Sequence, residues 1–230
     1  ARGPTGAPRG GTGLHLAVHA DRPDVIRVLL DAGIDPDVRN AAGRTALHDA
    51  IEGGRRQITE LLIDGGGATV DICAAAILGR LERLRQLLGE DPSRANDRST
   101  GLSPLGWAAF GNRVTAAAVL IDRGARMDDG ELLCAASAGH VEVGRLLLDR
   151  GVDPDAIDPG AGGTALHAAA AMRYTPDARP FVRMLLGRGA NPRIRDRKGR
   201  TPAGIAEARA AGGGRCPFAE IAAILGESGG

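Results

Sequence analysis

The stretch TALHDAI at residues 45–51 decides the fold, because copies of it recur along the chain. Four segments align with it closely: TGLHLAV (12–18), SPLGWAA (103–109), TALHAAA (164–170) and TPAGIAE (201–207). Two weaker copies, VDICAAA (70–76) and GELLCAA (130–136), fall between them. Self-similarity at a spacing of roughly 20–50 residues is typical of repeat proteins. The sequence therefore predicts about seven copies of one structural unit.

Each copy is followed by a second apolar run, such as VIRVLL (25–30) or VGRLLL (143–148). A hydroxyl residue that can cap a helix precedes five of the first segments: Thr12, Thr45, Ser103, Thr164 and Thr201. Glycines that can end a helix in the left-handed conformation follow the second runs: Gly33, Gly66, Gly124, Gly151 and Gly189. Such a helix pair cannot bury its own apolar face, so successive pairs must stack.

These residues resemble the ankyrin repeat family. TALH, SPLG, DAGIDPDVRN (31–40) and AGHVEVGRLLLDRGVDPD (138–155) are similar to successive parts of its consensus. The resemblance covers roughly residues 12–226 and implies an all-α solenoid of helix-turn-helix units. Hairpin-like fingers would project from one side, and the fingers and first helices would line a concave surface that binds other proteins.

From this resemblance we expect a flexible tail at residues 1–11 and a single domain at residues 12–230. Its repeats would start near residues 12, 45, 70, 103, 130, 164 and 201. The repeats at 70 and 130 are short, so most of the finger before each is missing, and Asp71, Asp129 or Glu131 would replace the capping hydroxyl. Full fingers at every second repeat would leave notches able to admit a side chain, a peptide or a small ligand.

The histidines and cysteines have structural explanations. His15, His48 and His167 occupy the histidine of the TxLH turn, which in this family forms hydrogen bonds within the loop, and His140 lies in GHVEV. Buried polar groups at a tight turn must find partners. Cys73 and Cys134 lie among alanines and are predicted to be small core residues. We therefore expect no catalytic residue, no metal site and no cofactor.

Carboxylates on the first helices have a similar explanation. Asp49 takes a position that is more often apolar in the family, and Glu52 lies one turn further along the same segment. A catalytic acid and base would have to converge on one cavity, and nothing in the sequence indicates that they do. We interpret both residues as part of a solvated helix face.

The predicted concave positions carry unexpected apolar residues, and exposed apolar patches often mark interaction sites. They are Ile77, Leu78, Phe110 and Met172. Tyr174 lies beside them, in four extra residues between the paired helices of repeat six. Alternatively, these side chains fill gaps left by the missing fingers. Trp107 is predicted to point into the core.

Polar residues complete the predicted partner-binding site. His19 and Glu52 occupy concave positions, and arginines of the fingers would form a charged rim: Arg44, Arg98, Arg197 and Arg200. Arginine binds carboxylates and phosphates in a bidentate manner, so an acidic partner or a phosphate-bearing ligand fits this rim.

Composition sets wider bounds. The 230 residues are 43% hydrophobic and 25% charged, which favours a folded chain over disorder. The formal net charge of +1 gives no overall field for nucleic acid or a membrane. The polar, glycine-rich opening lacks the apolar core of a signal peptide, so we expect a cytoplasmic protein. The abundance of arginine, alanine and glycine suggests a bacterial source.

The sequence thus favours a protein-protein interaction module that binds its partner through the concave face. An enzyme or small-molecule-binding protein that uses a pocket between the fingers is the alternative. A module for self-association is a third possibility.

Overall fold

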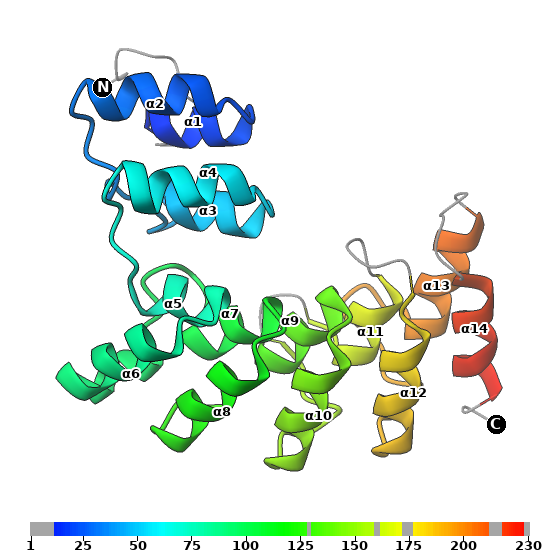
Figure 1. The fold of residues 1–230 in the computed structure, drawn as a ribbon. Helices are drawn as coiled ribbons and strands as arrows, with labels where there is room; N and C mark the ends of the chain where they lie inside the picture. Colours follow the sequence, from blue (N-terminus) through cyan, green and yellow to red (C-terminus); the bar gives the residue numbers. More distant parts are fainter. Residues whose placement is uncertain (1–11, 128–129, 159–161, 172–176, 212–217, 228–230) are drawn as a thin grey trace. The chain divides into compact units, whose positions relative to one another are not determined.

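The computed structural model describes residues 12–127, 130–158, 162–171, 177–211 and 218–227. Its contacts divide the chain into two compact units, Ala1–Pro104 and Leu105–Gly230. In the described ranges both units are built from helices and contain no β-strand (Figure 1). The predicted all-α class is therefore confirmed.

The first unit contains three helix pairs, in which the first helices α1, α3 and α5 contact one another in chain order and α2 contacts α4 (Figure 1). Its elements are α1 (Gly13–His19), α2 (Pro23–Asp31), α3 (Ala46–Glu52), α4 (Arg56–Glu60), the π-helical turn η1 (Leu61–Gly65), α5 (Ile72–Leu78), α6 (Leu81–Glu90) and the 3₁₀ turn η2 (Pro92–Asn96).

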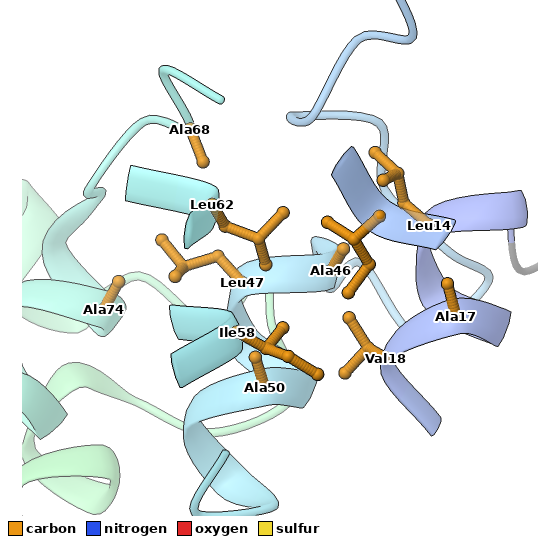
Figure 2. Close-up of a cluster of buried hydrophobic side chains, with 11 residues drawn as sticks. Leu14, Ala17, Val18, Ala46, Leu47, Ala50, Ile58, Leu62, Ala68 and Ala74 are labelled. Atoms are coloured by element: carbon orange, nitrogen blue, oxygen red, sulfur yellow. The ribbon is translucent and has the colours of Figure 1, made fainter. Parts of the chain in front are cut away.

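Leucine, isoleucine and valine side chains form the core of this unit (Figure 2). Leu14 and Val18 of α1 and Leu47 of α3 belong to one buried cluster, in which Leu47 lies beside Leu62, and Ile58 also contributes. Full burial of one such side chain contributes roughly 1.5–3 kcal/mol. Because Ala17 of α1 and Ala46 and Ala50 of α3 are small and buried, the two helices can approach closely.

The second unit repeats this arrangement, with α9, α11 and α13 in one layer and α8, α10, α12 and α14 in the next. Its elements are α7 (Pro104–Phe110), whose first residue belongs to the first unit, α8 (Val114–Asp122), α9 (Gly130–Ala138), α10 (Val141–Asp149), α11 (Ala165–Ala170), α12 (Arg179–Gly187), α13 (Pro202–Ala211) and α14 (Phe218–Glu227). Trp107 is buried, as predicted. The Phe181 ring lies so close to Gly144 that a Cβ there would be 2.8 Å from two ring carbons.

The histidines of the TxLH turns form the hydrogen bonds predicted within the loop, and His15 and His167 also bond to the end of the following finger. Thr12, Thr45 and Thr164 stand at the N-caps of α1, α3 and α11 in extended conformation. The backbone N–H of Thr12 donates to Nδ1 of His15, and Nε2 of His15 lies 2.9 Å from the carbonyl oxygen of Arg44. His167 repeats this arrangement with Thr164 and with the carbonyl of Arg200 at 3.0 Å.

These contacts determine the protonation state of the ring. A backbone N–H only donates and a carbonyl only accepts, so Nδ1 is the acceptor and Nε2 carries the proton. Burial also lowers the pKa of His167, although its bond to Arg200 opposes the shift. His140 is held similarly, with Nε2 3.0 Å from the carbonyl oxygen of Phe110 and a pKa lowered by burial. The structural roles predicted for these histidines are confirmed.

Four long connections form the fingers: residues 32–45 (first), 91–103 (second), 150–164 (third, with 159–161 not described) and 188–201 (fourth). Short connections, residues 66–71 and 123–129, precede α5 and α9. The predicted alternation of full and shortened fingers in the first five repeats is therefore present. The four extra residues predicted for repeat six also fall where expected, because residues 171–178 separate α11 from α12.

One local prediction was wrong. In the second repeat the residue with positive φ is Gly67 and not Gly66, because the π-helical turn Leu61–Gly65 widens the end of the helix and places Gly66 at φ −108°. Pro180 stands in the first turn of α12. Proline is tolerated there because the first N–H groups of a helix have no intrahelical acceptor.

The notch predicted between the first and second fingers is absent. A Cβ added to Gly43, at the turn of the first finger, would overlap the carbonyl oxygen of Ser99 in the second finger. The two fingers are therefore in backbone contact, although the repeat between them lacks a finger. Arg39 strengthens this region by donating to the carbonyl of Gly43 and to Asp71, the residue before α5.

Substitution of Gly43 by alanine should destabilise the protein more than the same substitution of Gly199. Both glycines occupy the same turn position with φ near +75°, but only Gly43 faces another backbone, and nothing lies within 4 Å of a Cβ at Gly199. The left-handed conformation alone costs an L-residue roughly 1–2 kcal/mol. Urea unfolding followed by circular dichroism should therefore give a larger loss for G43A than for G199A. Equal losses would contradict the close contact of the fingers.

Candidate functional site

Three of the predicted partner-binding residues come together in the first unit. His19 at the end of α1, Glu52 at the end of α3 and Arg44 of the first finger surround Asp49 of α3. We call His19, Arg44, Asp49 and Glu52 the charge cluster. Its members come from two repeats, so only stacking of the repeats brings them together.

Asp49 is the centre of this cluster. Its Oδ1 lies 2.9 Å from Nη2 of Arg44, and its Oδ2 lies 3.2 Å from Nε2 of His19. The same Arg44 nitrogen also contacts the carboxylate of Glu52. Arg44 thus bridges two carboxylates that lie three residues apart on one face of α3.

Burial decreases toward the rim of the cluster. Only 6% of the Asp49 side chain and 18% of the Arg44 side chain are exposed, against 42% for Glu52 and 63% for His19. The interpretation of Asp49 as a solvated residue was therefore wrong, whereas the exposure predicted for His19 and Glu52 is confirmed. Asp49 is buried because its position faces the preceding repeat, where most repeats place an apolar side chain.

Local structure holds each group in place. The finger turn fixes Arg44, because its backbone carbonyl accepts a hydrogen bond from His15 and its N–H donates to Asn40. Arg55 follows α3, donates to the carbonyl of His19 at 3.3 Å and lies 3.8 Å from Asp21. A cation beside the last carbonyls of α1 is favourable because the C-terminus of a helix is partially negative.

The cluster is suited to binding. Glu52 offers acceptor oxygens to a partner, and His19 offers an imidazole that can donate or accept. Within the described ranges, no three histidine, cysteine, aspartate or glutamate side chains come together as a metal-ligand set.

Removal of Arg44 should destabilise the protein more than removal of Asp49. Arg44→Ala leaves a buried carboxylate without its guanidinium partner, which costs roughly 3 kcal/mol in buried pairs. Asp49→Leu restores an apolar side chain at this position and leaves Arg44 with Glu52, so its cost should be small or negative. The free energies of unfolding in urea test this order. A larger loss for D49L than for R44A would contradict it.

The predicted apolar anchors differ in exposure. Ile77 is only 5% exposed, so its prediction as a surface residue was wrong: it packs in the core at the end of α5. Leu78 and Phe110 are half-buried. The Phe110 ring meets Trp107 edge-on, with ring centroids 6.3 Å apart. Met172 and Tyr174 lie outside the described residues.

The arginines of the fingers form less of a free rim than predicted. Arg98, Arg197 and Arg200 are exposed. Arg200 binds Asp196 through Nε at 2.8 Å, and this bond lowers the pKa of the Asp196 carboxyl to about 2. The Arg197 side chain lies across Gly162 of the third finger. The guanidinium group of Arg200 and the side chain of Arg197 are thus already in contact with the fingers.

Asp71 replaces the structural contributions of a missing finger. It accepts from the N–H of Ala74 at 3.0 Å as the cap of α5, which confirms the predicted replacement cap. Its Oδ1 also lies 3.2 Å from Nε2 of His48, where the equivalent histidines bond to finger carbonyls. Burial acts to raise the pKa of Asp71, but the hydrogen bonds and the charges of His48 and Arg39 outweigh it and give about 2.

Asp71→Asn should lower the melting temperature at pH 7, and this effect should disappear in acid. A carboxyl whose pKa is lowered by folding stabilises the protein above its unfolded pKa, and this contribution is lost as the pH falls toward 2. Asparagine retains the helix cap, so the substitution removes mainly the charge, which is worth roughly 2 kcal/mol. The difference between the melting temperatures of the two proteins should stay constant from pH 7 to about pH 5 and then shrink toward zero as the pH approaches 2. A constant difference would contradict the assignment.

Cys73 is a buried core residue, as predicted. Burial raises the pKa of its thiol to about 12, although a hydrogen bond from Thr100 opposes the shift. With this pKa the Cys73 thiol is protonated at neutral pH and is not a nucleophile. Cys134 is half-buried.

The geometry defines a class of helical repeat proteins with hairpin-like fingers, and comparisons with known proteins identify the family. A model described as ankyrin repeats (3 copies) matches residues 3–72, and one described as ankyrin repeats (many copies) matches residues 132–179. The chain belongs to the ankyrin repeat family.

Similar proteins share only a segment with this chain. Neurogenic locus notch homolog protein 1 of Danio rerio is 34% identical over 131 residues, which are 52% of this chain and 5% of that protein. Ankyrin repeat and KH domain-containing protein 1 of Homo sapiens is 36% identical over 113 residues (46% and 4%). NF-kappa-B inhibitor cactus of Drosophila melanogaster is 31% identical over 144 residues (62% and 24%).

The repeats and these relatives indicate a protein-protein interaction module. In the part of the chain that the structure describes, no helix combines the length and the apolar character needed to cross a membrane.

Proposed function

We propose that this chain binds a protein partner through the face of the first unit that carries the charge cluster. His19 and Glu52 make contact in this proposal, and Arg44 and Asp49 hold them in position. The supporting observation is the burial of Asp49, with 6% of its side chain exposed, at a position where a leucine would pack without an ionic partner.

The energetics of a buried ion pair support this reading. The cost of taking two charges out of water often exceeds their attraction, so apolar residues of similar size are usually at least as stabilising. Residues that break a local folding rule are most often found at functional sites. An apolar contact would stabilise the fold at least as well as the four charged groups do. Folding alone therefore does not explain why they are present.

Pre-organisation gives the cluster a function in binding. A long side chain that is immobilised on association costs about 0.5–1.5 kcal/mol in entropy. Arg44 is already held by Asp49 and Glu52, and Nε2 of His19 lies 3.2 Å from Oδ2 of Asp49. A partner would therefore meet polar groups whose positions are set before association.

The remaining predicted contacts are part of the proposal. Leu78 in the first unit and Phe110 in the second are half-buried and can serve as apolar anchors, with Met172 and Tyr174 as further candidates. Arg98, Arg197 and Arg200 would contact the partner at the rim. We also propose that residues 12–230 act as one domain, in the cytoplasm; the tail predicted at residues 1–11 lies outside the described residues.

A ligand pocket between the fingers has less support. The first and second fingers are in backbone contact at Gly43 and Ser99, so the first unit offers no notch there. We therefore do not propose a small-molecule or catalytic function.

The proposal is tested by capture of a partner and measurement of its affinity for two matched variants. The immobilised chain is exposed to a lysate of the source organism, and the retained protein is titrated against wild type, H19A/E52A and Q57A/E60A. Gln57 and Glu60 are exposed on α4 and provide the control. Loss of the exposed cluster groups should weaken binding about tenfold, as for contacts at the centre of an interface.

Equal melting temperatures of the variants show that the fold is retained. Wild-type affinity of H19A/E52A, or loss of binding in Q57A/E60A alone, would contradict the proposal. Phe110→Ala tests the anchor in the second unit by the same titration.

A further inference from the structure

The first and fourth fingers have the same turn geometry but different net charges. Residues 35–44 read DPDVRNAAGR, and residues 191–200 read NPRIRDRKGR. The first segment contains two acidic and two basic residues, so its net charge is zero. The second contains five basic residues and one acidic residue, so its net charge is +4.

The turns of the two fingers match in their hydrogen bonds. The N–H of Asn40 donates to the carbonyl of Arg44 at 2.8 Å, and the N–H of Asp196 donates to that of Arg200 at 2.9 Å. The glycines at the fourth turn position, Gly43 and Gly199, have φ of +75° and +74°.

Side chains complete the match. Nη1 of Arg39 donates to the carbonyl of Gly43 at 2.6 Å, and Nη1 of Arg195 donates to that of Gly199 at 2.7 Å. Asn40 Oδ1 accepts from two backbone N–H groups within its turn, and Asp196 Oδ1 does the same.

The side chains of two cations of the fourth finger therefore do not contribute to this turn. Arg193 and Lys198 stand where the first finger has Asp37 and Ala42. The first finger forms the same turn without them, and like charges at close range destabilise a fold. Their presence calls for an explanation other than folding.

The basic side chains of the finger are exposed. Arg193, Arg195 and Arg197 are exposed, and Ile194 and Asp196 between them are half-buried. Neither Arg193, Arg195 nor Lys198 forms an ion pair with another described residue. Acidic groups do lie nearby, because Asp155 of the third finger accepts from the N–H of Asn191, and Asp153 and Asp158 belong to that same finger.

We infer that the fourth finger is a docking surface for an acidic polypeptide segment of the partner. This inference rests on the proposed function, because it assumes that the partner is a protein. Charge complementarity supplies the recognition, and the rigid turn presents guanidinium groups that can bind carboxylates in a bidentate manner. Binding would be strongest at low ionic strength, since exposed charges are screened by salt.

Other anionic partners fit the surface less well. Single-stranded nucleic acid is usually bound by cations together with exposed aromatic side chains. In the described residues, Trp107, Phe181 and Phe218 are buried and Phe110 is half-buried. An anionic membrane favours basic segments beside exposed apolar residues, and the apolar Ile194 of this finger is half-buried.

Fluorescence anisotropy of a fluorescein-labelled decaglutamate peptide tests the inference without knowledge of the natural partner. The variant R193A/R197A/K198A should bind the peptide about tenfold more weakly than wild type at low salt, since each exposed ion pair contributes modestly. The double variant R193A/K198A leaves the Arg197 side chain against Gly162, so its loss of affinity for the peptide should be smaller. The control R27A/R56A/R85A removes three exposed arginines of α2, α4 and α6 and should bind like wild type.

Equal losses in the finger variant and the control would overturn the inference, because they would show that only net charge matters. Tighter finger-dependent binding to phosphatidylserine vesicles or to a decamer of deoxythymidine would also overturn it. The cluster variant H19A/E52A should bind decaglutamate like wild type. Failure of the charge-cluster proposal is thus seen in partner affinity, and failure of this inference is seen in peptide affinity.

Discussion

A hydrogen bond from a histidine ring to the backbone of the following finger is the interaction on which the rest of the fold depends. His15 accepts from Thr12 through Nδ1 and donates to Arg44 through Nε2, so one side chain joins the start of a helix to the end of a finger. The bond fixes where the finger ends and where the next first helix begins. The stacking of the apolar faces, including Leu14 and Leu47, follows from that placement (Figure 2).

Shortened repeats show how this constraint is met without a finger. The repeat that begins near Val70 has no finger carbonyl for His48, and the carboxylate of Asp71 takes its place. The same carboxylate caps α5 and binds Arg39, so a single residue performs three structural tasks. The contact of Gly43 with Ser99 then brings the neighbouring full fingers together. Loss of a finger therefore redistributes contacts and does not open a gap in the first unit.

The charged residues divide into those that folding requires and those that it does not. Asp196, Arg195 and Arg39 form hydrogen bonds that shape their turns. Asp49 is buried at a cost that an apolar residue would avoid, and Arg193 and Lys198 have no basic equivalent in the first finger, which forms the same turn. Both proposals, the partner contact at the charge cluster and the acidic docking surface at the fourth finger, thus rest on one criterion. In each case charged residues that folding does not require lie beside exposed groups.

The sequence by itself determined the repeat architecture, the capping residues, the structural histidines and the burial of Trp107. These features depend on the spacing of residues within one repeat, and this spacing can be recognised in the sequence because it follows the period of an α-helix. Only the tertiary structure decided the fates of Asp49, Ile77 and the notch between the fingers, because each depends on contacts between repeats. Asp49 could be recognised as unusual, but its partner His19 lies thirty residues away in the preceding repeat. The burial of a side chain depends on the neighbouring repeat that stacks on it. The pattern within one repeat does not specify which residues of that neighbour the side chain meets.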